Sequence, residues 1–241
     1  MTRERLDTLM VQLGLVENRG KAKARVMAGE VTVNGALATK AGYLVRDDSE
    51  IHVLGSPPFV SRGGLKLDHA LNDFQVDVKS KVVMDVGAST GGFTDCLIKR
   101  GASKVYAVDV GYGQLDYRLR VNPKVEVLER MNARYPILID QQIDLITIDV
   151  SFISVLKIIP NVTELLGEPG QLIVLFKPQF EVGKGQVGKR GIVRDPLLHA
   201  TILGHFLVWS IDRGFRLGGL TASPILGAEG NKEFLVLLRL S

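Results

Sequence analysis

The chain has 241 residues, of which 46% are hydrophobic and 23% are charged, with a formal net charge of +4. These values are typical of a folded globular protein, long enough for one large domain and a small one. The single cysteine, Cys96, excludes an intramolecular disulfide and a cysteine-built zinc site, so we expect a reducing compartment. The charged start MTRERLDTLM lacks the apolar segment of a signal peptide, and no apolar run approaches the roughly 18 residues of a membrane helix. We therefore expect a soluble, cytoplasmic protein.

The first 54 residues have the pattern of a small α+β unit. Four residues spaced i, i+3, i+4 and i+7 predict one apolar helical stripe: Leu6, Leu9, Met10 and Leu13. The segment RGKAKARVMAG predicts a second helix that is closed by Gly29. In EVTVNGALAT, alternating valines precede Asn34-Gly35, a dipeptide that strongly favours a type I′ hairpin turn. The segment EIHVL supplies a further strand.

Four basic side chains lie on the second predicted helix: Arg19, Lys21, Lys23 and Arg25. At 100° per residue they divide between two nearly opposite flanks, so they cannot all contact one phosphate strand. On charge alone, a solvated helix face and an RNA-binding face fit about equally well. The segment RLDTLMVQLGLVENRGKAKARVMAGEVTVNGA, however, resembles an S4 domain, a small RNA-binding module. This resemblance implies that the four residues contact an RNA backbone.

The segment GSPPFV contains two prolines and a glycine, which predicts a short, stiff linker over residues 55–60. We therefore expect one domain over residues 1–54 and a larger one over residues 61–241. In the larger domain, helices are expected over residues 62–74, 91–100, 154–166 and 195–213. Strands are expected in seven segments: VVMDVG, KVYAVDVG, VEVLER, LITIDVSF, QLIVLFKP, FRLGGLTASP and EFLVLLRL.

This alternation of buried strands and helices predicts an α/β fold with a parallel, doubly wound sheet. The last two strands are joined by a connection that is too short for a crossover helix, so they should pair antiparallel. A mostly parallel seven-stranded sheet with an antiparallel last strand is the architecture of the Rossmann-like S-adenosylmethionine-dependent methyltransferases. Dehydrogenase sheets usually lack the antiparallel strand.

The stretch DVGASTGG follows the first strand of this sheet and opens a helix. It could bind a dinucleotide, a phosphate or S-adenosylmethionine, or form only a tight strand-to-helix connection. Ser89 replaces the second glycine of GxGxxG, which disfavours a pyrophosphate site. Asp85 would repel a pyrophosphate but attract the ammonium of S-adenosylmethionine, unless it serves only as a helix partner. Asp109, after the second strand, is placed to accept hydrogen bonds from ribose hydroxyls.

S-adenosylmethionine is therefore the favoured ligand of the glycine-rich turn. Its candidate contacts are residues of the turn and of the next two strand ends: Asp85, Gly87, Ala88, Ser89, Gly91, Gly92, Phe93, Asp109 and Asn132. Among them, Gly87, Gly91 and Gly92 lack a side chain that would keep the backbone away from a ligand. Asn132 follows the third strand, where the adenine usually lies in this fold.

Four charged residues are candidates for catalysis. Lys66 lies on the helix before the sheet, Asp149 follows the fourth strand, Lys177 follows the fifth and Glu233 opens the last. Considered singly, Lys66 could be a solvated helix residue, Asp149 a helix cap and Glu233 a charged residue on an edge strand. Lys177 is the hardest to explain structurally, because lysine is seldom buried without a partner.

Five further segments resemble the TlyA family across nearly the whole chain: SRGGLKL, DVGASTGGFTDCL, IDVSFIS, KPQFEVGKGQVGKRGIVRD and GNKEFLVLLRL. This family joins an S4 domain to an FtsJ-like ribosomal RNA 2′-O-methyltransferase domain. FtsJ-like enzymes use a Lys-Asp-Lys-Glu tetrad, which corresponds here to Lys66, Asp149, Lys177 and Glu233. Glu229 is a rival for the fourth position, but the family's glutamate directly precedes an aromatic residue, as Glu233 precedes Phe234.

The resemblance implies S-adenosyl-L-methionine as cofactor and ribosomal RNA or ribosomal subunits as partner, with no metal and no membrane. It implies that Lys177, when neutral, accepts the proton of a ribose 2′-hydroxyl; alternatively, the lysines steer phosphate and Asp149 positions the hydroxyl. Further RNA contacts are expected before the sheet and in the glycine-rich segment EVGKGQVGKRGIVRDP, which is either a basic lid or a solvated loop: Arg62, Lys184, Lys189 and Arg190.

Two rival functions belong to other classes of protein. One is an RNA-binding protein whose methyltransferase domain is inactive, which the complete tetrad disfavours. The other is a membrane-lytic hemolysin, a label that members of the family often carry, which the absence of a spanning segment or a strong amphipathic helix disfavours. The modified nucleotide and the assembly state are left open by the sequence.

Overall fold

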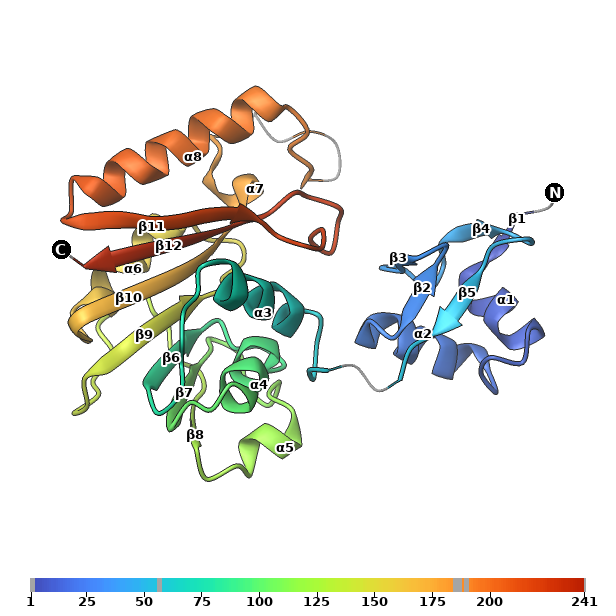
Figure 1. Ribbon diagram of the computed structural model, residues 1–241, viewed down its shortest axis with the longest axis horizontal. Coiled ribbons are helices and arrows are strands. Elements are labelled where there is room, and N and C mark those ends of the chain that lie inside the picture. Colours follow the sequence, from blue (N-terminus) through green and yellow to red (C-terminus); the bar gives the residue numbers. More distant parts are fainter. Residues whose placement is uncertain (1–2, 56–57, 184–187, 189–190, 241) are drawn as a thin grey trace. The chain divides into compact units, whose positions relative to one another are not determined.

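The structure is a computed structural model that describes residues 3–55, 58–183, 188 and 191–240. The chain divides into two compact units, Met1–Arg62 and Gly63–Ser241 (Figure 1). The domain limits and the linker over 55–60 that were inferred from the sequence stay a prediction. In the described part of the chain, no helix is long and apolar enough to cross a bilayer.

The first unit contains two helices and five short strands: β1 (Arg3–Arg5), α1 (Leu6–Gln12), α2 (Arg19–Ala28), β2 (Val31–Val33), β3 (Ala36–Leu37), β4 (Leu44–Arg46) and β5 (Ile51–Val53). Leu6 and Met10 of the predicted stripe are fully buried, whereas Leu13 lies beyond α1 and is 52% exposed. Strand β2 pairs antiparallel with β3 and β5. Asn34 and Gly35 both have positive φ, 50° and 77°, as a type I′ turn requires. The pairing of β1 with β4 was not predicted.

The second unit is an α/β domain built on one seven-stranded sheet. Its strands are β6 (Val82–Val86), β7 (Lys104–Val108), β8 (Val125–Leu128), β9 (Ile143–Ile148), β10 (Leu166–Phe176), β11 (Phe215–Ala222) and β12 (Phe234–Leu240). They lie in the order β11-β12-β10-β9-β6-β7-β8. Strand β12 is antiparallel to both of its neighbours, and the other pairs are parallel. The predicted methyltransferase-type sheet is therefore confirmed.

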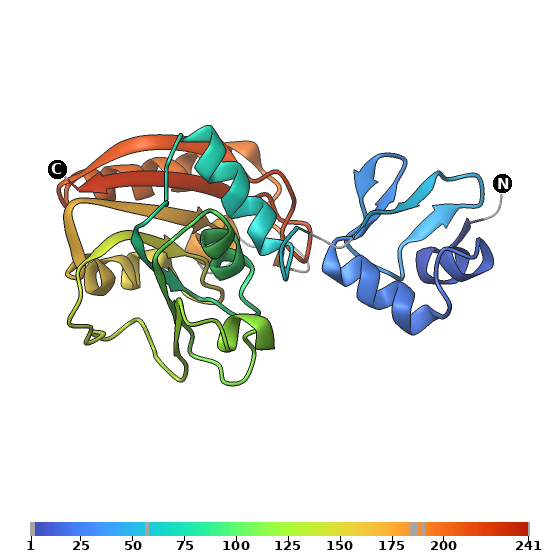
Figure 2. The same cartoon turned by 60° about the horizontal axis from the view of Figure 1, so that its bottom comes forward.

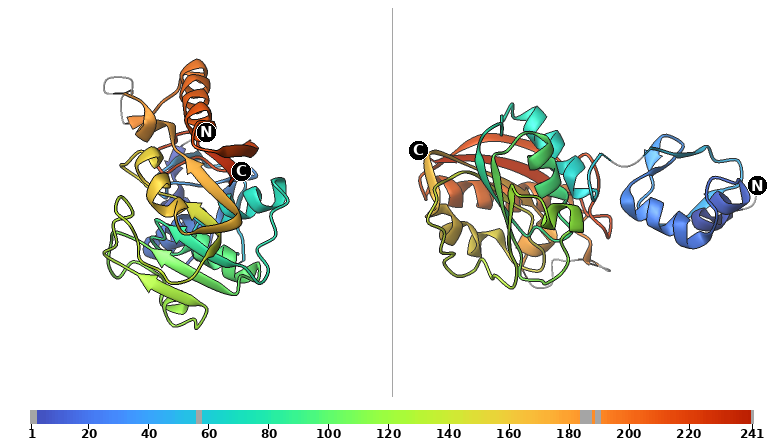
Figure 3. Two further views of the ribbon diagram at one scale, coloured as in Figure 1. Left: turned by 90° about the vertical axis from the view of Figure 1, so that its left-hand side faces the viewer. Right: turned by 90° about the horizontal axis from the view of Figure 1, so that it is seen from below.

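The helical elements of this unit are α3 (Gly63–Asp73), α4 (Gly92–Lys99), α5 (Tyr117–Arg120), the 3₁₀ helix η1 (Val155–Lys157), α6 (Ile159–Thr163), α7 (Pro178–Glu181) and α8 (Pro196–Ile211). Helices α3 and α4 cover one face of the sheet, while α6 and α8 cover the other (Figures 2 and 3). The helix predicted over 154–166 is wrong in extent, because it is divided into η1 and α6. Pro160 at the start of α6 has no N–H to continue a helix from the preceding turn.

Asp85 of β6 is fully buried in this domain. Its carboxylate accepts hydrogen bonds from Thr94 Oγ1 of α4 at 2.6 Å and from Thr147 Oγ1 of β9 at 3.0 Å. The pKa of Asp85 is raised to about 7, because burial and, to a smaller extent, the charge of Asp149 raise it by more than the hydrogen bonds from Thr94 and Thr147 lower it. The carboxylate therefore ties two strands to the helix that follows the glycine-rich turn.

We predict that Asp85 makes the stability of the protein depend on pH. The carboxyl group of Asp85 has a pKa of 3.8 in the unfolded chain and of about 7 in the folded protein. At a pH between these two values, the folded state therefore binds more protons than the unfolded state. The free energy of unfolding should therefore fall as pH rises through this window, by about 4 kcal/mol in the limit. Urea unfolding from pH 4 to pH 8 should show this fall in the wild type relative to Asp85→Asn. Parallel stability curves for the two proteins would contradict the assignment.

Candidate active site

The carboxyl ends of β6, β9 and β10 meet at one edge of the sheet, because these strands are parallel neighbours. Gly87 follows β6, Asp149 follows β9 and Lys177 follows β10. Strand β12 runs the opposite way, so its first residues lie at the same edge. Glu233 immediately precedes that strand. Four segments that are distant in the sequence thus contribute their ends to one place.

The glycine-rich turn needs its glycines for the packing of the chain itself. Gly87 has a φ of +88°, and a Cβ there would lie 2.3 Å from the backbone oxygen of Asp149. Gly91 has a φ of +97°, and its Cβ would lie 2.3 Å from Leu119 Cδ1. At Gly87 the obstacle is backbone, so a side chain could not be accommodated, whereas at Gly91 it is the end of a leucine side chain that could shift. At Gly91 the positive φ is therefore the main reason for glycine. The sequence predicted that glycine at these positions lets a ligand approach the backbone. The structure shows that the conformation and packing of the chain itself also favour glycine there.

The predicted cofactor residues fall into two groups. Asp109 follows β7 and is partly exposed; its Oδ2 accepts from the N–H of Ser89 at 2.7 Å and its Oδ1 from that of Gly111 at 2.6 Å. Ser89 and Asn132 are exposed, and Asn132 Oδ1 accepts from the N–H of Arg134. These side chains can reach a ligand at the carboxyl edge.

Other predicted cofactor residues face the interior. Phe93 is 3% exposed within α4, and Ala88 and Gly92 are also buried. Asp85 has no exposed surface, so in this conformation its carboxylate cannot contact the ammonium of a ligand directly. Its alternative role, as a partner of the helix after the turn, agrees with its hydrogen bond from Thr94.

The four candidate catalytic residues form two ion pairs. Lys66 Nζ lies 2.5 Å from Glu233 Oε2, and Lys177 Nζ lies 2.6 Å from Asp149 Oδ1. The side chains of Lys66 and Glu233 are only 11% and 4% exposed, so neither is a solvated surface charge. Those of Lys177 and Asp149 are 10% and 20% exposed. Each buried ammonium therefore has its own carboxylate, which offsets the cost of removing both charges from water.

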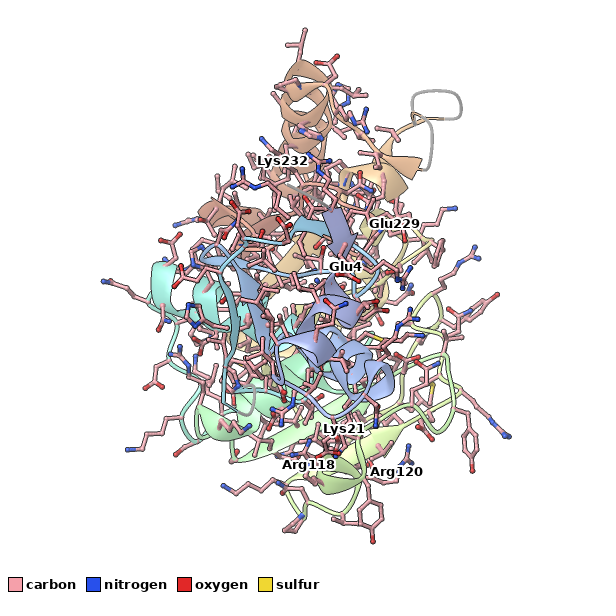
Figure 4. All side chains as sticks on the ribbon, turned by 90° about the vertical axis from the view of Figure 1, so that its right-hand side faces the viewer. Glu4, Lys21, Arg118, Arg120, Glu229 and Lys232 are labelled. Atoms are coloured by element: carbon pink, nitrogen blue, oxygen red, sulfur yellow. The ribbon has the colours of Figure 1, made fainter. Side chains whose placement is uncertain are left out.

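The register of the sheet relates the two pairs. Phe176 of β10 is paired with Phe234 of β12. Lys177 follows Phe176, and Glu233 precedes Phe234. Because the two strands are antiparallel, Lys177 and Glu233 lie opposite each other, one position beyond that pair. Glu229, the rival of Glu233, is exposed on the β11–β12 connection (Figure 4). The geometry favours Glu233 as the fourth member of the set.

Several side chains next to Lys177 were not predicted from the sequence. Its ammonium donates a hydrogen bond to Ser151 Oγ at 2.9 Å. It also lies 6.0 Å from the ring centre of Phe180. The ring of Phe180 lies 5.1 Å from that of Phe152, which is 92% exposed and has a φ of +63°. The positive φ of this bulky residue makes Phe152 a candidate for a functional role, and only the structure reveals it.

The predicted RNA-binding residues of the first unit are mostly paired with acids. Arg19 Nη2 lies 3.2 Å from the buried Asp7, and Arg25 Nη1 lies 2.6 Å from Glu30. Lys21, labelled in Figure 4, is paired with Glu17. Three of the four predicted cations of α2 are thus partly neutralised within the unit.

The remaining predicted RNA contacts have different outcomes. Lys23 is exposed, and no acidic partner for it occurs among the described residues. Arg62 is partly buried, and its Nη1 has no hydrogen-bond partner in the described part of the chain. Lys184, Lys189 and Arg190 lie outside the described residues. Within the described ranges, no group of three or more His, Cys, Asp or Glu side chains could hold a metal ion.

Comparison with known proteins gives consistent matches over both units. The pattern of the FtsJ-like methyltransferase family matches residues 59–240, and that of the S4 domain matches residues 4–51. The Bacillus subtilis protein YqxC is 48% identical over 98% of this chain and 85% of its own length. The Mycobacterium tuberculosis protein named 16S/23S rRNA (cytidine-2′-O)-methyltransferase TlyA is 42% identical over 98% of this chain and 90% of its own length.

Solved structures agree with these matches. A Streptococcus thermophilus protein of 42% identity aligns with a TM-score of 0.77 over 100% of this chain and 90% of that chain. An S-adenosylmethionine-dependent methyltransferase from Mesorhizobium loti, at 16% identity, has the same fold, with a TM-score of 0.51 over 71% of this chain and 96% of that chain. The chain therefore belongs to the TlyA family, in which an S4 domain precedes an FtsJ-like methyltransferase domain.

Proposed function

We propose that this protein transfers a methyl group from S-adenosylmethionine to a ribose 2′-hydroxyl of ribosomal RNA. The observation that carries the proposal is the pair of buried ion pairs at the carboxyl edge of the sheet, Lys66 with Glu233 and Lys177 with Asp149. The name of the Mycobacterium tuberculosis relative supports ribosomal RNA as the substrate and the ribose oxygen as the acceptor.

The residues at this edge fit S-adenosylmethionine. Asp109 presents a partly exposed carboxylate after the second strand of the domain, and each of its oxygens has a further lone pair available for a ribose hydroxyl. Exposed Ser89 and Asn132 lie on the adjoining turns. When bound, S-adenosylmethionine supplies an electrophilic methyl group on a sulfonium. In this site the negative charge of Asp149 already balances the positive charge of the Lys177 ammonium, which would otherwise repel the sulfonium.

Asp149 and Lys177 can orient and activate a hydroxyl. Asp149 Oδ1 is covered and receives no directed hydrogen bond, although the Lys177 ammonium is 2.6 Å away. The rest of this carboxylate retains exposure and can accept a hydrogen bond from an incoming 2′-hydroxyl. Lys177, in its neutral form, would then take the proton of that hydroxyl. Lys66, held by Glu233, adds a fixed positive charge that stabilises developing negative charge on the oxygen.

The exposed ring of Phe152 can support the base of the target nucleotide. Single-stranded RNA is commonly recognised by stacking of its bases on aromatic side chains. Phe152 is packed on Phe180, and along the chain it lies one residue after Ser151 and three after Asp149. A base stacked on this ring would bring its ribose towards the Lys177 and Asp149 pair.

The direct test is methyl transfer to ribosomal subunits from labelled S-adenosylmethionine, followed by mapping of the modified nucleotide. We expect label in RNA at a ribose, detected as resistance of the adjacent phosphodiester to alkaline hydrolysis. Label on a base would contradict the proposed chemistry. RNA binding without any transfer would favour an inactive methyltransferase domain, and lysis of lipid vesicles without transfer would favour the hemolysin.

We predict that Lys177→Ala lowers the methyl-transfer rate about 10²- to 10⁴-fold, because general acid–base groups contribute effects of this size. S-adenosylmethionine binding, measured by calorimetry, should change only a few-fold. Lys79→Ala is the matched control, since this exposed lysine precedes β6 and therefore lies at the opposite edge of the sheet. Wild-type transfer by the Lys177→Ala protein would exclude Lys177 from the chemistry.

We predict that Phe152→Ala lowers kcat/KM for RNA by about 5- to 150-fold, the effect expected for the loss of one base–aromatic stack. Thermal stability should hardly change, because the side chain is 92% exposed. Leu138→Ala removes an apolar side chain that is 94% exposed and serves as the control. Equal activity of the two variants on ribosomal subunits would show that Phe152 does not support the substrate.

A further inference from the structure

We propose that Glu181 is a positioning residue, which holds the loop that carries Asp149 in place against the segment that carries Lys177. Its consequence for catalysis rests on the proposed function. Glu181 is the last residue of α7, the four-residue helix that begins immediately after Lys177. Any group fixed by Glu181 is therefore fixed relative to Lys177.

Both carboxylate oxygens of Glu181 are used on the loop after β9. Oε2 accepts a hydrogen bond from Ser154 Oγ at 2.6 Å, and Oε1 accepts one from the backbone N–H of Val155 at 2.8 Å. Ser154 is the N-cap of η1, and its Oγ also accepts from the N–H of Leu156. Glu181 thus clamps the point at which the loop from Asp149 becomes helical.

This loop has a conformation that its own sequence does not favour. Phe152 lies in the left-handed region at a φ of +63°, which a non-glycine residue with a bulky side chain rarely adopts. The surroundings must therefore impose it. Three successive contacts do so, all from the Lys177–Glu181 segment: Lys177 with Ser151, Phe180 with Phe152, and Glu181 with Ser154 and Val155.

Glu181 differs from the other two anchors because it does not adjoin the reacting groups. Lys177 belongs to the proposed chemistry, and Phe152 with Phe180 forms the proposed stacking surface. Glu181 is partly buried, and desolvation raises its pKa while the hydrogen bonds from Ser154 and Val155 lower it. A partly buried carboxylate with two charge-assisted hydrogen bonds is a strong, directional anchor. Its loss would leave the Val155 N–H without a partner and release the loop.

A released loop would let Asp149 move away from Lys177. Displacements of about 1 Å in a positioned group can cost about a hundredfold in rate. We therefore expect Glu181→Gln, in which only the amide oxygen can accept, to lower kcat about tenfold. Glu181→Ala should lower kcat about a hundredfold. In both variants, KM for RNA and the Kd for S-adenosylmethionine should stay within about threefold of the wild type.

Controls separate positioning from a general loss of structure. Glu164→Gln changes an exposed carboxylate at the end of α6 and should retain wild-type kcat. Ser154→Ala should lower kcat by a smaller factor, and adding it to Glu181→Ala should have little further effect, because both changes break one network. Thermal melting should show that each variant is folded at the assay temperature. A fall in kcat that only follows the loss of folded protein would overturn the proposal.

A structural measurement keeps this inference independent of the methyl-transfer assay. In crystal structures of the wild type and Glu181→Ala, the distance from Lys177 Nζ to Asp149 Oδ1 should increase from 2.6 Å to beyond ion-pair contact in the variant. An unchanged distance together with unchanged kcat would overturn the role of Glu181. If the wild type modifies no ribose, the proposed function fails, and the distance alone then decides whether Glu181 positions the pair.

Discussion

The antiparallel pairing of β12 with β10 is the constraint on which the candidate site depends. Because β12 runs against its neighbours, its first residue lies at the edge where the parallel strands end. Glu233 thereby comes beside Lys177, close to the ends of β6 and β9. A parallel last strand would have placed Glu233 at the opposite edge and left Lys66 without its carboxylate. The topology of the sheet thus decides which charges can meet.

Burial determines what those charges can do once they meet. Two ammonium groups are largely buried here, and the carboxylate beside each of them offsets the cost of removing its charge from water. The compensation is local, since Lys66 is paired with Glu233 and Lys177 with Asp149. Lys177 of the second pair donates to Ser151 and lies beside Phe180, on which the exposed Phe152 packs. The two pairs therefore differ in surroundings, which agrees with a supporting role for Lys66 and a reacting role for Lys177.

Much of this arrangement could be predicted from the sequence, because it follows from the strand pattern. Apolar runs predicted the strands, and the short connection between the last two strands predicted that they pair antiparallel. Strand ends then placed Asp149 and Lys177 at one edge. Interactions between side chains on different short elements could not be predicted. The acids beside Arg19 and Arg25, the burial of Asp85 and the hydrogen bonds of Glu181 depend on tertiary distances that no local pattern encodes.

The most direct measurement is a crystal structure of the protein with S-adenosylhomocysteine. We expect the ribose hydroxyls of this product to contact Asp109 and its sulfur to face the pair formed by Lys177 and Asp149. Lys66 and Glu233 should lie beside that pair in the complex. A nucleoside bound away from Asp109, or a sulfur directed away from Lys177, would contradict the proposed site.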